Sequence, residues 1–244
     1  KNIILSFQFM KKKNKIFAHN SSWTFSKNVA NKFDHHIKKS VPMYNEFHWL
    51  GEQLSDYYLK EDSIVYDIGC STGTFLKKLA DRHKNKKNIK YYGIDVVKNM
   101  LKYAHKKNYS KNIKYLNKDI TKFKLLKSDL IISFYTIQFI QPKKRKELLN
   151  KIYKSLNWGG ALIFVEKVRS YDARTNEQIS NIYEEFKIEN GFTLKEIINK
   201  KKSLKGILEP FSSKANLDML KRAGFIDMST VGKYLSFEFF LAIK

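Results

Sequence analysis

The segment VYDIGCSTG, residues 65–73, restricts the possible folds of this chain more than any other feature. A short apolar, β-branched run over residues 63–68 stops at Gly69, which predicts a buried strand, and a helix over residues 74–81 is expected to open directly from the glycine turn. Gly69 and Gly73 let the backbone turn tightly and let a ligand approach the main chain without a Cβ in the way. The spacing is not the GxGxxG of dinucleotide enzymes, so the loop suits a ligand that has no pyrophosphate.

The same alternation of strand and helix continues along the chain. Because strands that alternate with helices are joined by right-handed crossovers, the pattern predicts a mostly parallel sheet. Further strands are expected over residues 90–94, 113–116, 129–134 and 161–165, with helices over 99–107 and 145–156 and a turn at 158–160.

Helical patterns also precede and follow this central part. They are expected over residues 29–41, 47–57, 173–190, 193–202 and 213–223, and two final strands over 225–231 and 235–243 suit an antiparallel hairpin at the sheet edge. We see no linker or repeat, so we expect one domain over residues 23–244 behind a flexible basic segment, residues 1–22. The chain starts at Lys1, and Met10 is an alternative start.

Acidic residues follow the next two predicted strands. Asp95 could accept two hydrogen bonds from ribose hydroxyls, and Asp119 could accept from an adenine amino group while Ile120 packs on the ring. Strand-end aspartates also cap helices, so any one of them could have only that role. With Asp67 before the glycine loop, three acids at three successive strand ends converge on one crevice and predict S-adenosylmethionine binding. The predicted fold class is therefore α/β: a Rossmann-like class I methyltransferase fold with a mostly parallel seven-stranded sheet, helices on both faces and an N-terminal helical cap.

Composition limits the other classes of function. The formal net charge is +24, but only five of the 47 basic residues are arginines, a skew typical of proteins from AT-rich genomes. The lysines are also scattered over the whole length, whereas a binding groove would concentrate them. We therefore expect no direct nucleic-acid binding. Cys70 is the single cysteine and the six histidines lack metal-ligand spacing, so neither a disulfide nor a metal site is expected. No apolar run suits a signal peptide or a membrane helix, which favours a cytoplasmic protein that does not bind membranes.

The sequence resembles the carboxy-S-adenosylmethionine synthase family over nearly its whole length, as a divergent member. The motifs that carry the resemblance are Trp23-Thr24-Phe25, Ser40-Val41-Pro42-Met43-Tyr44, the glycine loop Asp67 to Gly73, Thr136-Ile137-Gln138-Phe139, Glu166-Lys167, Asn190-Gly191-Phe192 and Ala223-Gly224-Phe225.

The resemblance implies a reaction other than methyl transfer. The family takes a carboxyl group from prephenate, converts the S-methyl of S-adenosylmethionine into S-carboxymethyl and releases phenylpyruvate. The product, carboxy-S-adenosylmethionine, serves a partner enzyme in tRNA wobble uridine modification. A homodimer is implied as well, in which the neighbouring subunit can supply the carboxylate-binding residue. The implied cofactor contacts are Tyr44, Gly69, Cys70, Ser71, Asp95, Val96, Asp119, Ile120 and Phe134.

Three positions depart from the family pattern. Phe134 and Val96 each replace an Asn, and Lys201 replaces the Arg that binds the product carboxylate, with Lys200 or Lys202 as possible helpers. Lys offers a point charge where Arg offers a bidentate fork, so the change is not conservative. A conventional methyltransferase acting on a small molecule therefore stays an alternative, and a non-catalytic RNA-binding module is a third.

Two more residues invite a catalytic role. Cys70 could be a nucleophile, but no base is evident near it in the sequence. Glu166 could act as a base at its strand end, although structural pairing is the competing interpretation.

Overall fold

The computed structural model describes residues 30–244, so the expected basic segment 1–22 and the motif Trp23-Thr24-Phe25 lie outside the described residues. Within the described part, seven strands form one sheet in the order β3-β2-β1-β4-β5-β7-β6. The strands are β1 (Ile64–Ile68), β2 (Lys90–Asp95), β3 (Ile113–Asn117), β4 (Ser128–Phe134), β5 (Leu156–Lys167), β6 (Asp227–Tyr234) and β7 (Phe237–Ile243).

The first five strands are parallel, and β7 runs antiparallel between β5 and β6. The expectations of a mostly parallel sheet and of a C-terminal hairpin at its edge are therefore confirmed. Chain order reverses between β1 and β4, which is the position where ligands bind in open α/β sheets.

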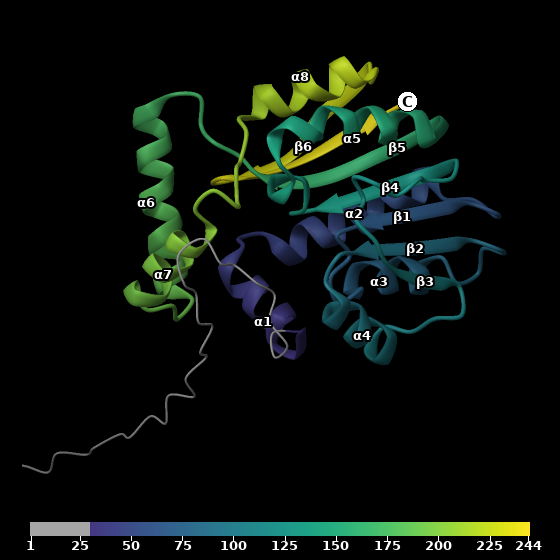
Figure 1. Cartoon of the computed structure of the whole chain (residues 1–244), viewed down its shortest axis with the longest axis horizontal. Helices are drawn as coiled ribbons and strands as arrows, with labels where there is room; N and C mark the ends of the chain where they lie inside the picture. The colour runs from purple at the N-terminus through teal and green to yellow at the C-terminus, as the bar shows by residue number, and fades with distance from the viewer. Residues whose placement is uncertain (1–29) are drawn as a thin grey trace, which may run out of the picture.

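Helices cover both faces of this sheet, as expected (Figure 1). They are α1 (Ala30–Ser40), α2 (Tyr44–Tyr58), α3 (Thr74–Arg82), α4 (Lys98–Lys107), α5 (Pro142–Ser155), α6 (Ala173–Glu189), α7 (Leu194–Leu204) and α8 (Ser213–Ala223), with a short 3-10 helix, η1 (Ile137–Phe139), after β4.

Alternate strand residues feed two separate cores. Val65 packs with residues of α2, α3 and α4 on one face, whereas its neighbour Tyr66 packs with residues of α5 and α8 on the other. This period of two is what a sheet that is buried on both faces requires. In Figure 1, α6 and α7 stand together beyond one end of the strands, and α1 lies at the same end.

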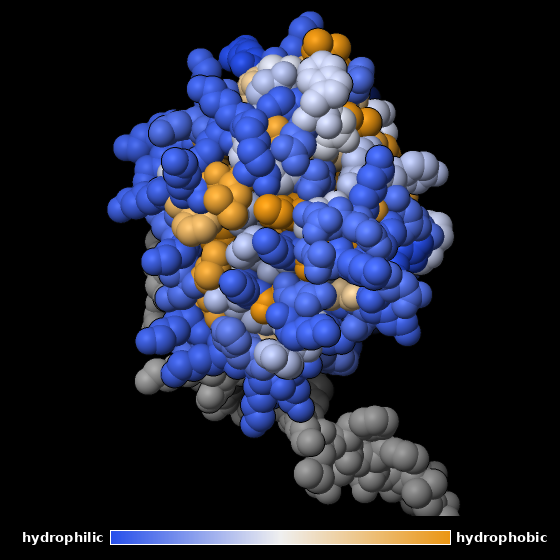
Figure 2. All heavy atoms as spheres, turned by 90° about the vertical axis from the view of Figure 1, so that its right-hand side faces the viewer, coloured by the Kyte–Doolittle hydropathy of each residue, from blue (hydrophilic) through white to orange (hydrophobic). Residues whose placement is uncertain are grey.

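The outer surface is mostly polar. Figure 2 shows one face on which hydrophilic residues predominate and hydrophobic residues appear in small groups. Among residues 30–244, no helix is long and apolar enough to cross a bilayer.

Two local predictions were wrong. Residues 158–160 form a bulged part of β5 and not a turn, and the Gly159 N–H donates to the Lys244 carbonyl at 2.8 Å, a partner far away in sequence. The strand expected over residues 225–231 begins at Asp227 instead, because Gly224 (φ +116) ends α8 and Phe225 packs into the core.

Candidate functional site

A cavity of about 960 Å³ lies at the carboxyl ends of the parallel strands. Its volume is at the upper end of the range for small-molecule sites, so it has room for a cofactor and a second small molecule. All ten residues that the sequence nominated line it: Tyr44, Gly69, Cys70, Ser71, Asp95, Val96, Asp119, Ile120, Phe134 and Lys201. Their individual roles stay predictions.

The glycine loop forms the floor of the cavity as the sequence suggested. Gly69 has φ +75, and a Cβ there would overlap the side chain of Thr136. Gly73 has φ +73 and caps α3, and its Cβ would overlap the ring of Tyr115. Both positions therefore need glycine for conformation and for space. One polar group of the loop, the Ser71 hydroxyl, is buried and has no hydrogen-bond partner among the described residues.

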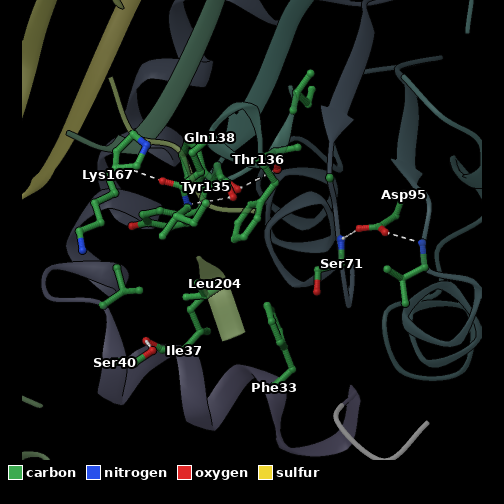
Figure 3. A pocket seen from close by; sticks show the side chains of 18 of the residues that line it. Phe33, Ile37, Ser40, Ser71, Asp95, Tyr135, Thr136, Gln138, Lys167 and Leu204 are labelled. Atoms are coloured by element: carbon green, nitrogen blue, oxygen red, sulfur yellow. Dashed lines mark hydrogen bonds between the residues drawn. The ribbon is translucent and has the colours of Figure 1, made fainter. Parts of the chain in front are cut away.

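Asp95 braces this loop. Its carboxylate accepts the Ser71 N–H at 2.9 Å and the Val97 N–H at 2.7 Å, as Figure 3 shows. The Val97 bond holds the residue that precedes α4, but Val97 is the N-cap of that helix and no side chain caps it, so the capping interpretation is wrong for Asp95. A carboxylate has about four acceptor positions, so Asp95 can still accept from a ligand. Burial raises the pKa of Asp95, and the backbone N–H donors act against that rise.

Asp119 is exposed at the rim and accepts two bonds from Thr121 through Oδ1, which forms a local turn. Ile120 beside it is buried and offers the cavity an apolar surface, and Val96 is 64% exposed. This part of the wall can hold a flat ring with a polar edge.

Asp67 is a site residue that the sequence analysis quoted in its motif without naming it as a contact. It lines the cavity and is 4% exposed, and no donor among the described residues bonds its carboxyl group. Burial and the nearby Asp95 raise the pKa of Asp67 to about 8. Two carboxyl groups so close together favour a ligand that carries positive charge.

Aromatic side chains line the middle of the cavity. Phe134 stacks on Phe75 with ring centroids 4.7 Å apart, and Tyr44 lies 4.2 Å from His48. Burial lowers the pKa of His48 to about 3, so this ring is neutral. The phenol of Tyr135 stacks on Tyr44 at 6.0 Å, and its hydroxyl is buried without a hydrogen-bond partner in the described chain.

Lysines gather at the far end of the same cavity, from β5, α6 and α7. Lys167 and Lys187 both place their ammonium groups over the ring of Tyr183, at 4.8 and 4.3 Å from its centroid. Lys201 pairs with Glu184 at the rim, and this Lys201 belongs to the same chain as the cavity that it lines. Figure 3 shows Lys167 and Asp95 at opposite ends of the cavity.

Helix α1, the first helix of the described chain, covers one side of the cavity. Asp34 accepts hydrogen bonds from the hydroxyls of Thr72, at 2.7 Å, and Thr74, at 2.9 Å, so α1 is fastened to the glycine loop. Phe33 and Ile37 line the cavity from this helix (Figure 3).

Two catalytic alternatives find no support in the geometry. Glu166 does not line the cavity, and its carboxylate accepts the N–H groups of Ile137 and Gln138 at 2.9 and 2.7 Å, so it anchors η1. Burial raises the pKa of the Cys70 thiol well above its usual range, which disfavours the thiolate. In the described chain, no group of three His, Cys, Asp or Glu side chains is placed to hold a metal ion.

The geometry fits S-adenosylmethionine. The glycine cradle, the Ser71 hydroxyl and the carboxyl groups of Asp67 and Asp95 offer hydrogen-bonding groups to a molecule that carries an ammonium, a sulfonium and a ribose. A bound cation would also favour the ionised form of Asp67. Sequence comparison decides the family. A protein from Staphylococcus epidermidis named carboxy-S-adenosyl-L-methionine synthase is 40% identical over 223 residues, which cover 91% of this chain and 97% of the relative.

This chain belongs to the carboxy-S-adenosyl-L-methionine synthase family. A second synthase, from Campylobacter lari, is 34% identical over 90% of this chain and 94% of its own length. The model of a methyltransferase domain matches residues 65–160, which span β1 to the bulge in β5. The family resemblance and the expectation of an S-adenosylmethionine-dependent enzyme are thereby confirmed.

Solved structures agree on the fold of this synthase-family chain. A putative O-methyltransferase from Nostoc punctiforme superimposes with a TM-score of 0.63 at 13% identity, covering 89% of this chain and 59% of that one. Human N-acetylserotonin methyltransferase in complex with its cofactor gives 0.60 at 17% identity, covering 90% of this chain and 56% of that one. At such low identity these structures support the fold alone.

Proposed function

We propose that this protein is a carboxy-S-adenosyl-L-methionine synthase that takes the carboxyl group from prephenate. The observation that carries the proposal is the separation of charge within one cavity. Strand-end carboxyl groups lie at β1, β2 and β3, aromatic rings at β4, and lysines at β5 and beyond. Such a cavity suits a cationic cofactor beside an anionic second substrate.

The cofactor end would bind S-adenosylmethionine through the predicted residues. Asp95 would accept from the ribose hydroxyls, and Asp119 and Ile120 would hold the adenine. Asp67 and Ser71 would meet the amino-acid part of the cofactor, which carries the charged ammonium group. Tyr44 and Phe134 would pack beside the sulfonium, whose positive charge is attracted to aromatic faces.

The bound cofactor would supply a methyl group whose protons are acidified by the adjacent sulfonium. Atom balance then requires prephenate to lose one carboxyl group and its hydroxyl, so that phenylpyruvate and water accompany the carboxymethyl product. The role of the protein is to hold both molecules in register and to limit the access of water. Helix α1, fastened to the glycine loop by Asp34, is suited to that second task.

The family resemblance also supports a proposal for the wider setting of the reaction. We infer that the product supports tRNA wobble uridine modification and that the enzyme works in the cytoplasm. We also infer a homodimer, since Ile182 and Ile188 of α6 and Leu194 and Ile198 of α7 are 44% to 64% exposed. Light scattering should show twice the chain mass, and a monomer at micromolar concentration would refute the dimer.

The test of the activity is direct. Purified protein is incubated with S-adenosylmethionine and prephenate, and the cofactor pool is measured by mass spectrometry. The synthase predicts a cofactor heavier by one carbon dioxide and an equal amount of phenylpyruvate, both absent when prephenate is omitted. Folded protein that binds the cofactor and yields no such product would refute the proposal.

A further inference from the structure

At the lysine end of the cavity, the described residues place the ammonium groups of Lys167 and Lys187 close together. Lys167 and Lys187 both lie over the ring of Tyr183. The pKa of Lys200 is lowered first by burial and then by repulsion from Lys187 and Lys167. Glu184 is the acid that acts on Lys167 and Lys187, and its carboxylate is already paired with Lys201. Like charges brought together in this way favour a bound anion.

The ring of Tyr183 fixes where these charges lie. Its hydroxyl donates to the carbonyl of Ser40 at 2.7 Å, which ties α6 to the end of α1. Lys187 is 7% exposed although it carries an ammonium group, so its position inside the cavity is built by the fold. Burial is the largest cause that lowers the pKa of Lys187, to about 8, followed by repulsion from Lys167.

A second and independent feature lies beside this charge. Tyr135 lines the cavity, and its hydroxyl is buried with no hydrogen-bond partner among residues 30–244. A buried hydroxyl without a partner is disfavoured unless a ligand bonds it. The backbone of Tyr135 is in the left-handed region, with φ 57, which is unusual for an aromatic residue and is concentrated at functional sites.

The protein holds Tyr135 in this conformation with specific contacts. The Tyr135 N–H donates to the Val165 carbonyl at 2.6 Å, and the Gln138 side chain donates to the Tyr135 carbonyl at 3.3 Å. The same Gln138 side chain accepts the Lys167 N–H at 2.8 Å. One amide therefore fixes Tyr135 to Lys167, and Figure 3 shows both side chains on the same side of the cavity.

We propose that Tyr135, Lys167 and Lys187 form the site that binds the carboxylates of the second substrate, with the Tyr135 hydroxyl as donor to one carboxylate oxygen. The inference rests on the proposed function, and none of these three residues is among the contacts predicted from the sequence. Nearby rings of Tyr44 and Phe237 suit the hydrocarbon part of an organic acid. Inorganic phosphate shares the charge of such a ligand but lacks that apolar part.

Prephenate binding is tested on protein saturated with S-adenosylhomocysteine, which has no methyl group and cannot react. Isothermal titration calorimetry should show prephenate binding to the wild type. Tyr135→Phe should weaken it about 10-fold or more, the effect expected from losing one hydrogen bond to a charged group. Lys187→Met should weaken it at least as much. Affinity for S-adenosylhomocysteine should change less than about two-fold, and the melting temperature of Tyr135→Phe should not fall, because its hydroxyl has no partner to lose.

Matched controls lie outside the cavity. Tyr66 is a buried tyrosine of β1 whose hydroxyl accepts the Leu126 N–H at 3.2 Å, and the Lys244 ammonium lies 4.8 Å from the ring centre of Tyr153. Tyr66→Phe and Lys244→Met should bind prephenate as the wild type does.

The possible outcomes separate this inference from the activity. Wild-type affinity for prephenate in both Tyr135→Phe and Lys187→Met would overturn the site, even if the wild type forms carboxylated cofactor. Competition by inorganic phosphate as strong as by prephenate would overturn the assignment to an organic acid. Prephenate binding that depends on Tyr135, without carboxylated product in the wild type, would support the site and refute the synthase activity.

Discussion

Replacing Asp95 by Asn tests the foundation of the cofactor site. Asn has nearly the shape of Asp, but it keeps one acceptor oxygen and replaces the other by an NH2 donor. In the wild type the two carboxylate oxygens accept from Ser71 and Val97 separately. One of these two N–H groups must therefore lose its acceptor and face another donor.

Two magnitudes follow from this geometry. An unsatisfied N–H beside the substituted, half-buried side chain should lower the free energy of unfolding by about 1–3 kcal/mol. For a chain of this size, that corresponds to a fall in melting temperature of roughly 2–10 °C. In the complex, the ribose would also lose a bond to a charged acceptor, so the affinity for S-adenosylmethionine should fall about 10- to 100-fold.

Calorimetry measures both effects, by scanning for stability and by titration for affinity. Asp119→Asn is the matched comparison, because Asp119 is an exposed strand-end acid bonded to Thr121 alone among the described residues. We expect it to lower the affinity only about three-fold, since water screens an exposed carboxylate. Wild-type cofactor affinity in Asp95→Asn, or a larger loss in Asp119→Asn, would refute this account of the site.

Three further changes test other parts of the cavity. Gly69→Ala should abolish measurable cofactor binding in titration and lower the melting temperature, because the added Cβ meets Thr136. Gly159→Ala is the control: Gly159 has the same φ of +75 but open space around it, so binding should stay intact. Asp34→Ala removes both bonds between α1 and the glycine loop and should speed cofactor release about 10-fold in stopped-flow measurements, and an unchanged rate would argue against α1 as a cover. Because the pKa of Lys187 and of Lys200 is lowered to about 8, raising the pH from 7 to 9 removes positive charge and should weaken prephenate binding several-fold. Between pH 8 and about 10 these two lysines bind fewer protons in the folded than in the unfolded chain, so ligand-free stability should rise with pH in that window in thermal scans.

The cofactor half of the site could be predicted because its signals are local. A strand that ends in Asp95 places this acid at the carboxyl edge of the sheet, and the glycines of the loop predict a turn from the local sequence alone. The parallel order of the strands then brings these ends together.

The lysine half could not be predicted in the same way. Lys187 and Lys200 reach the cavity only because α6 and α7 fold back over the strand ends, which is a property of tertiary packing. In the sequence, the run around Lys201 has the appearance of a solvated helix face. The left-handed backbone of Tyr135 also has no local signal, since the residue needed for it in a turn would ordinarily be Gly or Asn.

The order of charges along the sheet edge bears on which reaction the cavity can favour. Methyl transfer to a neutral acceptor gains nothing from three lysines in the same cavity, because their field opposes the binding of a cationic cofactor. An anionic co-substrate reverses that balance, since its carboxylates neutralise the lysines and attract the sulfonium across the aromatic middle of the cavity. Each ligand should therefore raise the affinity of the other by the same factor, as thermodynamic linkage requires. A site with this electrostatic arrangement suits joining a carboxyl group to the cofactor better than giving its methyl group away.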